Sequence, residues 1–300
     1  MSSRRQDLNL LLALNALLQE RSVTRAADKL GLAQPTLSAS LARLRRHFDD
    51  ELLVRFGNEY RLTPLAVRLR DRAEIALGEA DRVFHSRADF DPSRSTREFK
   101  LLASDYAQTV IGGPLADLLA REAPGTRLRF TSITTAVLDT LEQSLLTHDL
   151  LLLPHGFVAD MPYQDVFEDE WMCLVASSND AVGESLTVED LRRLPWVVSY
   201  SGPTAATPAW RQIRMAGIEP RPQVVTENFL SVPDLVAGSP RIALLQKRLV
   251  NRLGARSDVR ALPCPFPAGR LVEGMWWHPG KGDEPESLYL RQSILSALKH

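Results

Sequence analysis

The sequence is poor in cysteine and contains no long hydrophobic run. Its two cysteines, Cys173 and Cys264, cannot form a disulfide framework, and we interpret both as inert buried thiols rather than redox sensors. No apolar stretch approaches the ~20 residues that span a bilayer. The N-terminal segment carries Asn9 and Asn15 and lacks the small-residue cleavage site of a signal peptide. These absences predict a cytoplasmic protein with no membrane partner.

Motifs of common enzyme classes are also absent from the sequence. There is no Gly-x-Ser-x-Gly elbow, no Gly-x-Gly-x-x-Gly turn after a strand and no phosphate-binding loop. The six histidines have no metal-ligand spacing, and no Cys/His cluster has zinc spacing. We therefore predict that the protein is not an enzyme and uses no cofactor and no metal.

Charge is distributed unevenly along a chain that is long enough for about two domains. Residues 1–70 contain twelve Lys and Arg against seven Asp and Glu, a surplus of five positive charges. The whole chain has 36 basic and 37 acidic residues, so the remainder carries an excess of six negative charges. A basic head on an acidic body suits a phosphate-binding module attached to a second domain.

Residues 7–48 have the pattern of three short helices. Asp7 and Ser22 are placed to cap the first two, and Gly31 can adopt the left-handed conformation of a tight turn. The third helix starts at Gln34-Pro35, and its inward stripe is Leu37, Leu41, Leu44 and Phe48. Its outward face is formed by Gln34, Thr36, Ser38, Ala39, Ala42, Arg43 and Arg46. Short polar side chains followed by arginines suit a helix in the major groove of DNA, although a ligand-free three-helix unit has the same leucine pattern.

A short hairpin is predicted at residues 51–62 around the turn Gly57-Asn58. Arg55 and Arg61 would project from this wing toward the DNA backbone or the minor groove. Together with the preceding helices, the wing predicts a helix-rich, winged helix-turn-helix domain that covers residues 1–62.

Thr63 and Pro64 open a further helix, which we expect to end at residue 86. Its apolar stripe consists of Leu65, Leu69, Ala73, Ala76, Ala80 and Val83. A helix of about twenty residues spans ~30 Å, which is too long to be buried by a small winged domain alone. We therefore predict that the stripe forms a dimer contact with a second copy, with packing on its own chain as the alternative. The polar segment 87–96 is expected to be the hinge to the body.

From residue 97 the sequence alternates between expected strands and helices, as in α/β proteins with parallel sheets, with a helix expected at 136–146 and a strand at 171–176. We expect two lobes, lobe I at 97–166 and 268–300 and lobe II at 167–267. A ligand would bind in the crevice beyond the carboxyl ends of the strands. The candidate effector-binding residues, at strand ends and helix starts, are Ser104, Asp105, Thr134, Asn228, Phe229, Gln246, Arg248 and Trp276. The aromatic wall of Phe229 and Trp276 suits a phenol or an aromatic acid, although either ring could belong to the core.

The same residues carry a family resemblance. The run Ala26-Ala27-x-x-Leu30-x-x-x-Gln34-Pro35-x-Leu37-Ser38-x-x-Leu41-x-x-Leu44, followed by Leu52-Leu53-x-Arg55 and Thr63-Pro64, resembles the DNA-binding domain of the LysR-type transcriptional regulators. The body is more loosely similar to the aromatic-responsive subgroup, which includes regulators of naphthalene/salicylate degradation and nodulation regulators. This second likeness is carried by Asp7-Leu8-Asn9-Leu10-Leu11, Phe90-Asp91-Pro92, Ser104-Asp105, Glu122-Ala123-Pro124-Gly125, and Met275-Trp276-Trp277-His278 with Leu290-Arg291-Gln292.

The resemblance implies a two-lobed, periplasmic-binding-protein-like effector domain that follows the winged domain and the long linker helix. It implies a regulator that binds an inverted-repeat operator in double-stranded DNA as a homodimer or homotetramer and responds to a small effector. RNA polymerase would be a partner if the regulator activates transcription. The main DNA contacts would come from Gln34, Pro35, Thr36 and Ser38. Many members have a long polar or basic residue after that serine, whereas this chain has Ala39, so Arg43 would take more of the readout.

Two other classes share parts of this pattern. A transport-type solute-binding protein would share the body, but it needs a signal peptide and would lack the basic head. A corepressor-like α/β protein whose winged module does not bind DNA would share the domain order. Salt-sensitive binding to DNA separates both alternatives from a transcriptional regulator.

Overall fold

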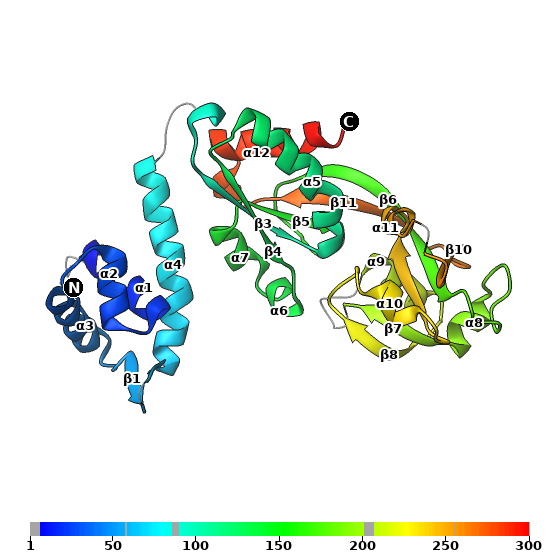
Figure 1. Cartoon of the computed structure of the whole chain (residues 1–300), viewed down its shortest axis with the longest axis horizontal. Coiled ribbons are helices and arrows are strands. Elements are labelled where there is room, and N and C mark those ends of the chain that lie inside the picture. The colour runs from blue at the N-terminus through cyan, green and yellow to red at the C-terminus, as the bar shows by residue number, and fades with distance from the viewer. Residues whose placement is uncertain (1–6, 58, 86–89, 201–206, 255, 300) are drawn as a thin grey trace. The chain divides into compact units, whose positions relative to one another are not determined.

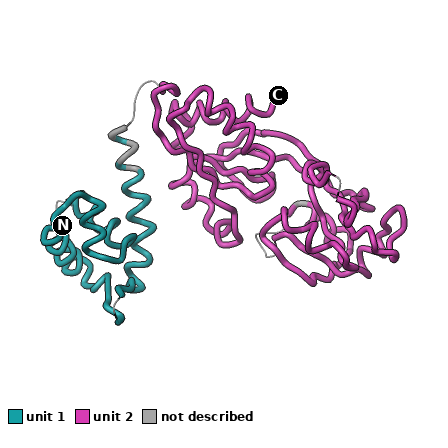
Figure 2. The backbone as a smooth tube through the Cα atoms, viewed as in Figure 1, with its two compact units in different colours: residues 1–87 teal, residues 88–300 magenta. Residues whose placement is uncertain are grey.

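The computed structural model describes residues 7–57, 59–85, 90–200, 207–254 and 256–299. The chain divides into two compact units, Met1–Arg87 and Ala88–His300 (Figure 2). The division falls inside the segment that the sequence predicts as a hinge. Among the described residues, no helix combines the length and the apolar character needed to cross a membrane.

Unit 1, where the structure describes it, consists of helices and a short hairpin. In chain order these elements are α1 (Leu8–Glu20), α2 (Val23–Leu30), α3 (Gln34–Phe48), β1 (Leu53–Phe56), β2 (Glu59–Leu62) and α4 (Pro64–His85). The predicted caps are confirmed: Asp7 accepts from the Asn9 N–H at 3.1 Å, and Ser22 accepts from the Arg25 N–H at 3.3 Å. Gly31 ends α2 with a φ of 64°, the left-handed conformation in which the chain turns toward α3.

The core of unit 1 forms where its helices meet. Leu37, Leu41 and Leu44 are buried on the inner side of α3, as the leucine pattern predicts. Helix α4 lies alongside α1 (Figure 1), and Ala66 and Ala73 of α4 belong to the same buried cluster. Small side chains allow helices to approach closely, so α4 is packed firmly onto the winged unit along this side.

Unit 2 consists of two α/β lobes (Figure 1). Lobe I contains β3 (Glu98–Ala103), α5 (Asp105–Glu122), β4 (Arg127–Ser132), α6 (Thr135–Leu138), α7 (Leu141–Thr147), β5 (Leu150–Pro154), β11 (Arg270–Trp276) and α12 (Pro285–Ala297). Lobe II contains β6 (Tyr163–Ala176), α8 (Val188–Arg193), β7 (Pro195–Ser199), α9 (Pro208–Met215), β8 (Arg221–Thr226), α10 (Val232–Val236), β9 (Ile242–Gln246), α11 (Lys247–Arg252) and β10 (Val259–Pro263). Short 3₁₀ turns lie at Pro92–Arg94 and Pro279–Lys281.

One sheet runs through both lobes in the strand order β4-β3-β5-β11-β6-β9-β7-β8, with β10 added to β6. Strand β3 pairs in parallel with β4 and β5, and β7 pairs in parallel with β8 and β9. The antiparallel pair β6–β11 joins the two halves. These long strands cross between the lobes in Figure 1, so they are the hinge strands of unit 2.

Two elements of unit 2 differ from the sequence prediction. Strand β6 begins at Tyr163, well before the strand expected at 171–176, because its first half is largely exposed and lacks an apolar pattern. That half is a strand because it pairs with β11, which is distant in the sequence. The single helix expected at 136–146 is divided into α6 and α7, because Thr140 leaves the helical conformation with a φ of −133°.

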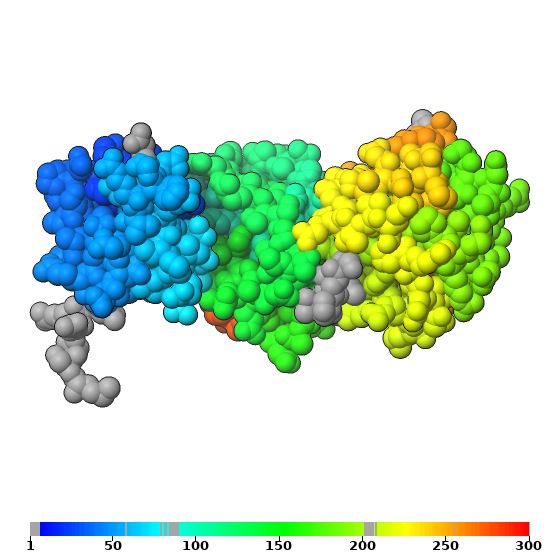
Figure 3. Space-filling model, turned by 90° about the horizontal axis from the view of Figure 1, so that it is seen from below, coloured from blue at the N-terminus to red at the C-terminus, as the bar shows by residue number. Residues whose placement is uncertain are grey.

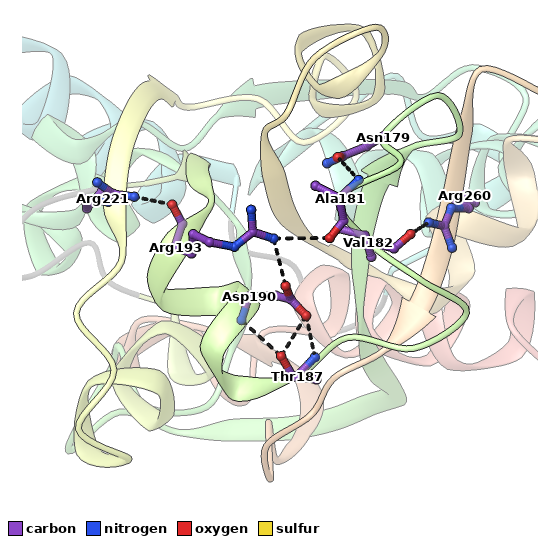
Figure 4. A network of polar contacts seen from close by, with 8 residues as sticks. All are labelled: Asn179, Ala181, Val182, Thr187, Asp190, Arg193, Arg221 and Arg260. Carbon is purple, nitrogen blue, oxygen red and sulfur yellow. Dashed lines mark hydrogen bonds and ion pairs between the residues drawn. The ribbon is translucent and has the colours of Figure 1, made fainter.

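Arginine side chains fasten the loop between β6 and α8 of lobe II (Figure 4). Arg193 donates to the Ala181 carbonyl at 3.1 Å and to Asp190 at 3.0 Å. Arg260, from β10, donates to the Gly183 carbonyl at 2.7 Å. Because Asp190 also belongs to the capping box of α8, the loop is held from the helix on one side and from the sheet on the other.

Candidate nucleic-acid interface and interlobe cavity

The start of α3 presents a polar, solvent-exposed surface. Its exposed residues there are Gln34, Pro35, Thr36, Ser38 and Ala39. Ala33, at the N-cap position, offers no side-chain acceptor to the first N–H groups, in contrast to the capped starts of α1 and α2. Pro35 has no N–H and the Thr36 N–H donates to the Ala33 carbonyl at 3.0 Å, so it is mainly the helix dipole that favours an anion such as a phosphate at this end. The start of α3 can therefore contact both base edges and the nucleic-acid backbone.

The two predicted arginines of α3 are exposed but make contacts within unit 1. Arg43 donates to the Asp7 carboxylate at 3.0 Å, and both side chains are accessible to solvent. Arg46 donates to the Ala42 carbonyl one turn earlier at 3.3 Å. An exposed ion pair contributes only about 0–1 kcal/mol, so Arg43 can exchange Asp7 for a phosphate at little cost.

The wing carries the other two predicted cations. Arg55 donates to the Gly57 carbonyl at 3.1 Å, and the Arg61 guanidinium lies 3.9 Å from the centre of the Phe56 ring. The Phe56 side chain is 62% exposed, so the ring supports Arg61 at the surface instead of filling a core. Both guanidinium groups remain accessible to a phosphate.

Arg45 is a further residue of this interface that sequence reasoning missed. Its guanidinium donates to the Glu51 carbonyl at 2.8 Å and to the Leu53 carbonyl at 2.9 Å. It also pairs with the Glu51 carboxylate at 3.0 Å. Arg45 thus fastens the wing to α3. No local signal separates it from Arg43 and Arg46, because its role depends on where the wing returns.

The predicted stripe of α4 is divided between two environments. Leu69 and Ala73 pack in the core of unit 1, so their assignment to a dimer contact is corrected: the winged unit itself covers that side of the helix. The half-buried or exposed members of the stripe are Leu65, Ala76, Ala80 and Val83. These four remain available to a second copy.

A cavity lies between the lobes of unit 2. Figure 3 shows the green surface of lobe I touching the yellow surface of lobe II. The cavity walls are Ser104, Tyr106, Ile133, Leu138, Leu153, Pro154 and Phe157 from lobe I, with Trp171, Tyr200, Thr207, Phe229, Gln246 and Leu271 from lobe II and the hinge strands. None of these described wall residues carries a charge, and five of them are aromatic.

Three of the predicted effector-binding residues line this cavity: Ser104, Phe229 and Gln246. The structure places the other five, Asp105, Thr134, Asn228, Arg248 and Trp276, outside its wall. Thr134 caps α6 by accepting from the Val137 N–H, and Asn228 accepts from the Ser231 N–H. These polar groups serve the local turn in which they lie.

The predictions that Trp276 and Arg248 line the cavity are corrected for different reasons. Trp276 is buried in a separate apolar cluster of lobe I, where its indole N–H donates to the Leu153 carbonyl at 2.8 Å. Strand β11 presents Leu271, not Trp276, to the cavity. Arg248 is exposed and lies 5.0 Å from the centre of the Phe167 ring. The aromatic wall is therefore built from other residues.

That wall is formed around Phe229 by three rings that sequence reasoning missed. The ring centres of Tyr106 and Trp171 lie 6.4 Å from that of Phe229, and the Tyr200 ring lies at 5.5 Å. Tyr106 follows the predicted pair Ser104-Asp105, and Tyr200 directly follows β7. We select candidate residues from the sequence at strand ends and helix starts, a criterion that we call the strand-end rule. Applying this rule to every aromatic residue would have found both.

Hydrogen bonds between the lobes hold unit 2 in a closed form. The donors are the Leu230 N–H to Asp105 (2.8 Å), the Tyr200 hydroxyl to the Ile133 carbonyl (3.2 Å), the Arg211 guanidinium to the Gly156 carbonyl (2.7 Å) and the Thr135 N–H to Glu227 (2.9 Å). The bonds from Thr135 hold the pKa of Glu227 below its ordinary value. Asp105 thus joins the lobes beside the cavity without lining it.

Two buried polar atoms on the cavity wall, Trp171 Nε1 and Gln246 Oε1, have no hydrogen-bond partner among the described residues. Trp171 and Gln246 are opposite one another in the β6–β9 ladder, so the donor and the acceptor belong to neighbouring positions of one wall. A hydroxyl group can accept from the indole and donate to the amide. Both residues line the cavity, and its described wall residues are uncharged.

The hinge strands also bury a carboxyl group. Glu273 of β11 is fully buried, and neither of its side-chain oxygens has a hydrogen-bond partner among the described residues. Burial, together with the nearby charge of Asp169, raises the pKa of Glu273 to about 8. Asp169 accepts from the Tyr106 hydroxyl at 2.6 Å, and burial together with this bond raises the pKa of Tyr106. Glu273 therefore keeps its proton at neutral pH.

The two units match two regions of one protein family. Residues 8–67 match the bacterial regulatory helix-turn-helix proteins of the lysR family, and residues 93–298 match the LysR substrate binding domain. The chain therefore belongs to the LysR family of transcriptional regulators, with a DNA-binding helix-turn-helix and an effector-binding domain. The prediction that it is not an enzyme is confirmed by this membership.

Nodulation regulators are among the proteins that are similar to this chain over nearly its whole length. Nodulation protein D 2 of Rhizobium tropici is 31% identical over 96% of this chain and 92% of its own length. Nodulation protein D 1 of Mesorhizobium japonicum is 32% identical, with the same coverage of 96% and 92%.

Solved structures confirm the fold predicted from the sequence. A probable transcriptional regulator from Pseudomonas aeruginosa superposes with a TM-score of 0.72 at 23% identity, covering 98% of this chain and 97% of that one. CbnR complexed with its target DNA superposes with a TM-score of 0.67 at 17% identity, covering 97% and 100%. Both likenesses span the winged unit and the two lobes.

Proposed function

We propose that α3 and the wing of this regulator bind an inverted-repeat operator in double-stranded DNA. The observation that carries the proposal is the exposed start of α3, which has no side-chain cap, together with a wing on which Arg55 and Arg61 are exposed. Base edges in the major groove would be contacted by Gln34, Pro35, Thr36 and Ser38, and phosphates by Arg43, Arg46, Arg55 and Arg61. Short side chains suit close approach to base edges, and guanidinium groups suit phosphate oxygens. CbnR, whose fold is shared, is a regulator with a known target DNA complex.

Footprinting on genomic fragments that the protein retains at low salt tests this proposal. We expect protection of two half-sites related by a two-fold axis and separated by whole helical turns. Binding should be strong at low salt and lost as salt rises. Absence of protection at low salt would refute it.

We propose that α4 joins two copies into a dimer and that two dimers form a tetramer. Leu65, Ala76 and Val83 are spaced by eleven and seven residues, close to whole helical turns, so they share one face. Val83 is 73% exposed, which is unusual for a valine on a packed helix. A two-fold dimer through this face would match the symmetry of an inverted repeat.

Light scattering with matched variants tests the dimer face. Val83→Glu should halve the mass of the assembly, because a carboxylate would be buried in the contact. Val67→Glu is the control, since Val67 is also exposed but lies on the opposite side of α4. A wild-type mass for Val83→Glu, or the same loss for both variants, would contradict the assignment.

We propose that the effector is a small, neutral, phenolic aromatic compound that binds in the interlobe cavity. The described wall is aromatic and uncharged, and it holds an unpaired donor and an unpaired acceptor. An aromatic acid would bury a carboxylate there without a cationic partner among the described wall residues, which is unfavourable. Of the two ligand classes that the sequence suggests, the cavity favours the phenol.

Thermal shift with matched ligands tests the effector class. We expect p-cresol and 7-hydroxyflavone to stabilise the protein, 4-hydroxybenzoate to have no effect, and flavone without a hydroxyl to act weakly. Stabilisation by the benzoate and not by the phenols would refute the class.

We further propose that the protein acts in the cytoplasm, where a regulator reaches the chromosome. RNA polymerase would be its partner if the effector-bound form activates transcription. Transcription in vitro with purified polymerase tests this: effector-dependent transcript supports it, and loss of transcript on effector addition indicates a repressor.

A further inference from the structure

The two thiols that the sequence predicts to be buried lie in contact in lobe II. The Sγ atom of Cys173, in β6, is 3.6 Å from the Sγ atom of Cys264, although 91 residues separate them in the sequence. Both cysteines are free. A disulfide bond is about 2.05 Å long, so side-chain rotations that move the sulfurs roughly 1.5 Å would join them.

The backbone already holds the two cysteines in place. Strands β6 and β10 are paired, with Leu262 opposite Cys173, and Cys264 follows at the end of that ladder. Pro263 and Pro265 flank Cys264, and proline restricts the backbone of the segment. Because residues two apart on paired strands share a face, both thiols lie on the same side of the sheet. A bond between them requires no new pairing of the chain.

The two thiols differ in access to solvent. Cys264 is partly exposed, whereas Cys173 is fully buried. Contact with Cys264 and burial raise the pKa of the Cys173 thiol. An oxidant would therefore meet Cys264 first, and Cys173 would be the resolving thiol.

We propose that Cys173 and Cys264 form a reversible intrachain disulfide when a peroxide oxidises the protein. The Cys264 sulfur attacks one peroxide oxygen, the O–O bond breaks, one water leaves and a sulfenic acid forms. The Cys173 sulfur then attacks the Cys264 sulfur, the S–O bond breaks, and the thiol proton leaves with the hydroxide as a second water. Two thiols lose two electrons, and the peroxide is reduced to two waters. A dithiol reverses the reaction.

The disulfide would act on the wall of the interlobe cavity. The Cys264 thiol donates to the Trp171 carbonyl at 3.4 Å, and this donor is lost when the disulfide forms. Trp171 lines the cavity and lies on the same face of β6 as Cys173. Transient disulfides in the cytosol are commonly regulatory. The link to the effector rests on the function proposed above, whereas the disulfide itself does not.

Peptide mass spectrometry of the full chain after hydrogen peroxide treatment tests the disulfide. We expect a Cys173–Cys264 cross-linked peptide and a rise in unfolding temperature of about 5–10 °C, because the bond closes a long loop. Dithiothreitol should reverse both. Cys173→Ser and Cys264→Ser are the matched controls and should show neither. Disulfides between chains, sulfinic acid at Cys264 without a cross-link, or unmodified thiols would overturn the proposal.

Binding of p-cresol to the oxidised and reduced forms tests the link to the cavity. A difference in affinity of about threefold or more, absent from Cys264→Ser, supports it. Equal affinities would refute the link to the cavity. The cross-linked peptide tests separately whether the disulfide forms. Failure of p-cresol to bind either form counts against the phenolic effector and not against the disulfide.

Discussion

Polar groups are exposed in the proposed DNA interface of unit 1, whereas several are buried at the cavity and the hinge strands of unit 2. On α3 and the wing the polar side chains are exposed, and Arg43 and Arg61 keep replaceable partners at the surface. In unit 2, polar atoms of Trp171, Gln246 and Glu273 are buried with no hydrogen-bond partner among the described residues. A buried unsatisfied polar group costs about 1–3 kcal/mol until a ligand or a proton satisfies it.

Because of this difference, the two sites should bind their ligands through different interactions. Exposed cations bind phosphates by displacing counterions, so salt controls the strength of that contact. Buried dipoles act where water and ions do not enter, so salt has little influence on them. A regulator with both sites can sense a neutral molecule in its cavity and respond through its contact with a charged molecule, DNA. Four predictions test this contrast.

The largest expected effect is that of salt on operator binding. If the interface neutralises six to ten phosphates, the affinity should fall about 10³- to 10⁵-fold between 50 and 200 mM salt. The affinity for p-cresol should change less than about twofold, because ligand and wall are neutral. Fluorescence anisotropy and calorimetry measure the two constants. Similar salt dependence at both sites would remove the contrast.

Glu273→Gln should change how folding stability depends on pH. The folded-state pKa of about 8 lies above the ordinary value of 4.5, so between these values the native protein keeps a proton that the unfolded chain loses. The free energy of unfolding should therefore fall as pH rises from 4.5 to 8 and then level off, by on the order of 5 kcal/mol for a shift of this size. The amide does not titrate, so the variant should lack this decrease. Urea unfolding at pH 5, 7 and 9 measures it.

The control for that experiment is Glu142→Gln, which changes an exposed glutamate of α7. It should follow the wild-type pH dependence. Parallel curves for wild type and Glu273→Gln would mean that Glu273 is ionised in the folded protein at neutral pH.

Ser38→Ala and Arg43→Ala should each weaken operator binding about 10- to 100-fold, as expected for the loss of one base contact or one cationic contact. Arg43→Ala should also lower the salt slope by about one, whereas Ser38→Ala should relax sequence preference. Gel-shift titrations against operator and scrambled DNA separate the two. The dimer mass should stay unchanged. Arg192→Ala, an exposed ion-paired arginine of lobe II, is the control and should have no effect.

The smallest expected effect comes from the cavity. Gln246→Leu should weaken p-cresol binding about five- to tenfold and leave toluene binding nearly unchanged, because the variant removes the proposed acceptor for the hydroxyl. Arg248→Ala lies outside the wall and should change neither. Calorimetry gives the ratio of the two affinities. An unchanged ratio in Gln246→Leu would place the hydroxyl elsewhere.

Unit 1 could be predicted nearly to the residue, because its signals are local. Asp7, Ser22 and Thr63 cap helices through bonds to backbone groups two or three residues away. Gly31 and Pro64 mark a helix end and a helix start for equally local reasons. The leucines of α3 follow the helical period, so their burial is readable from spacing. Arg45 escaped prediction because its partners lie on the wing.

The cavity could be predicted only in part, because it is assembled from strands that are distant in sequence. Ser104, Phe229 and Gln246 satisfied the strand-end rule, but so did Asn228 and Arg248, which point elsewhere. Side-chain direction depends on sheet register, and register shifts within the β6–β11 pair beside Glu273.

The sequence by itself determined the family, the winged unit and the two-lobed body, and it predicted that a ligand binds between the lobes. Fixed spacing of caps, leucines and turn residues over short distances was sufficient for each. Only the tertiary structure decided which side of α4 is free, which residues form the cavity wall, and that Cys173 lies against Cys264. These facts depend on packing between segments that are far apart in the chain. The local sequence pattern of one segment carries no information about which segment packs against it. The small number of cysteines therefore did not predict that the two lie in contact.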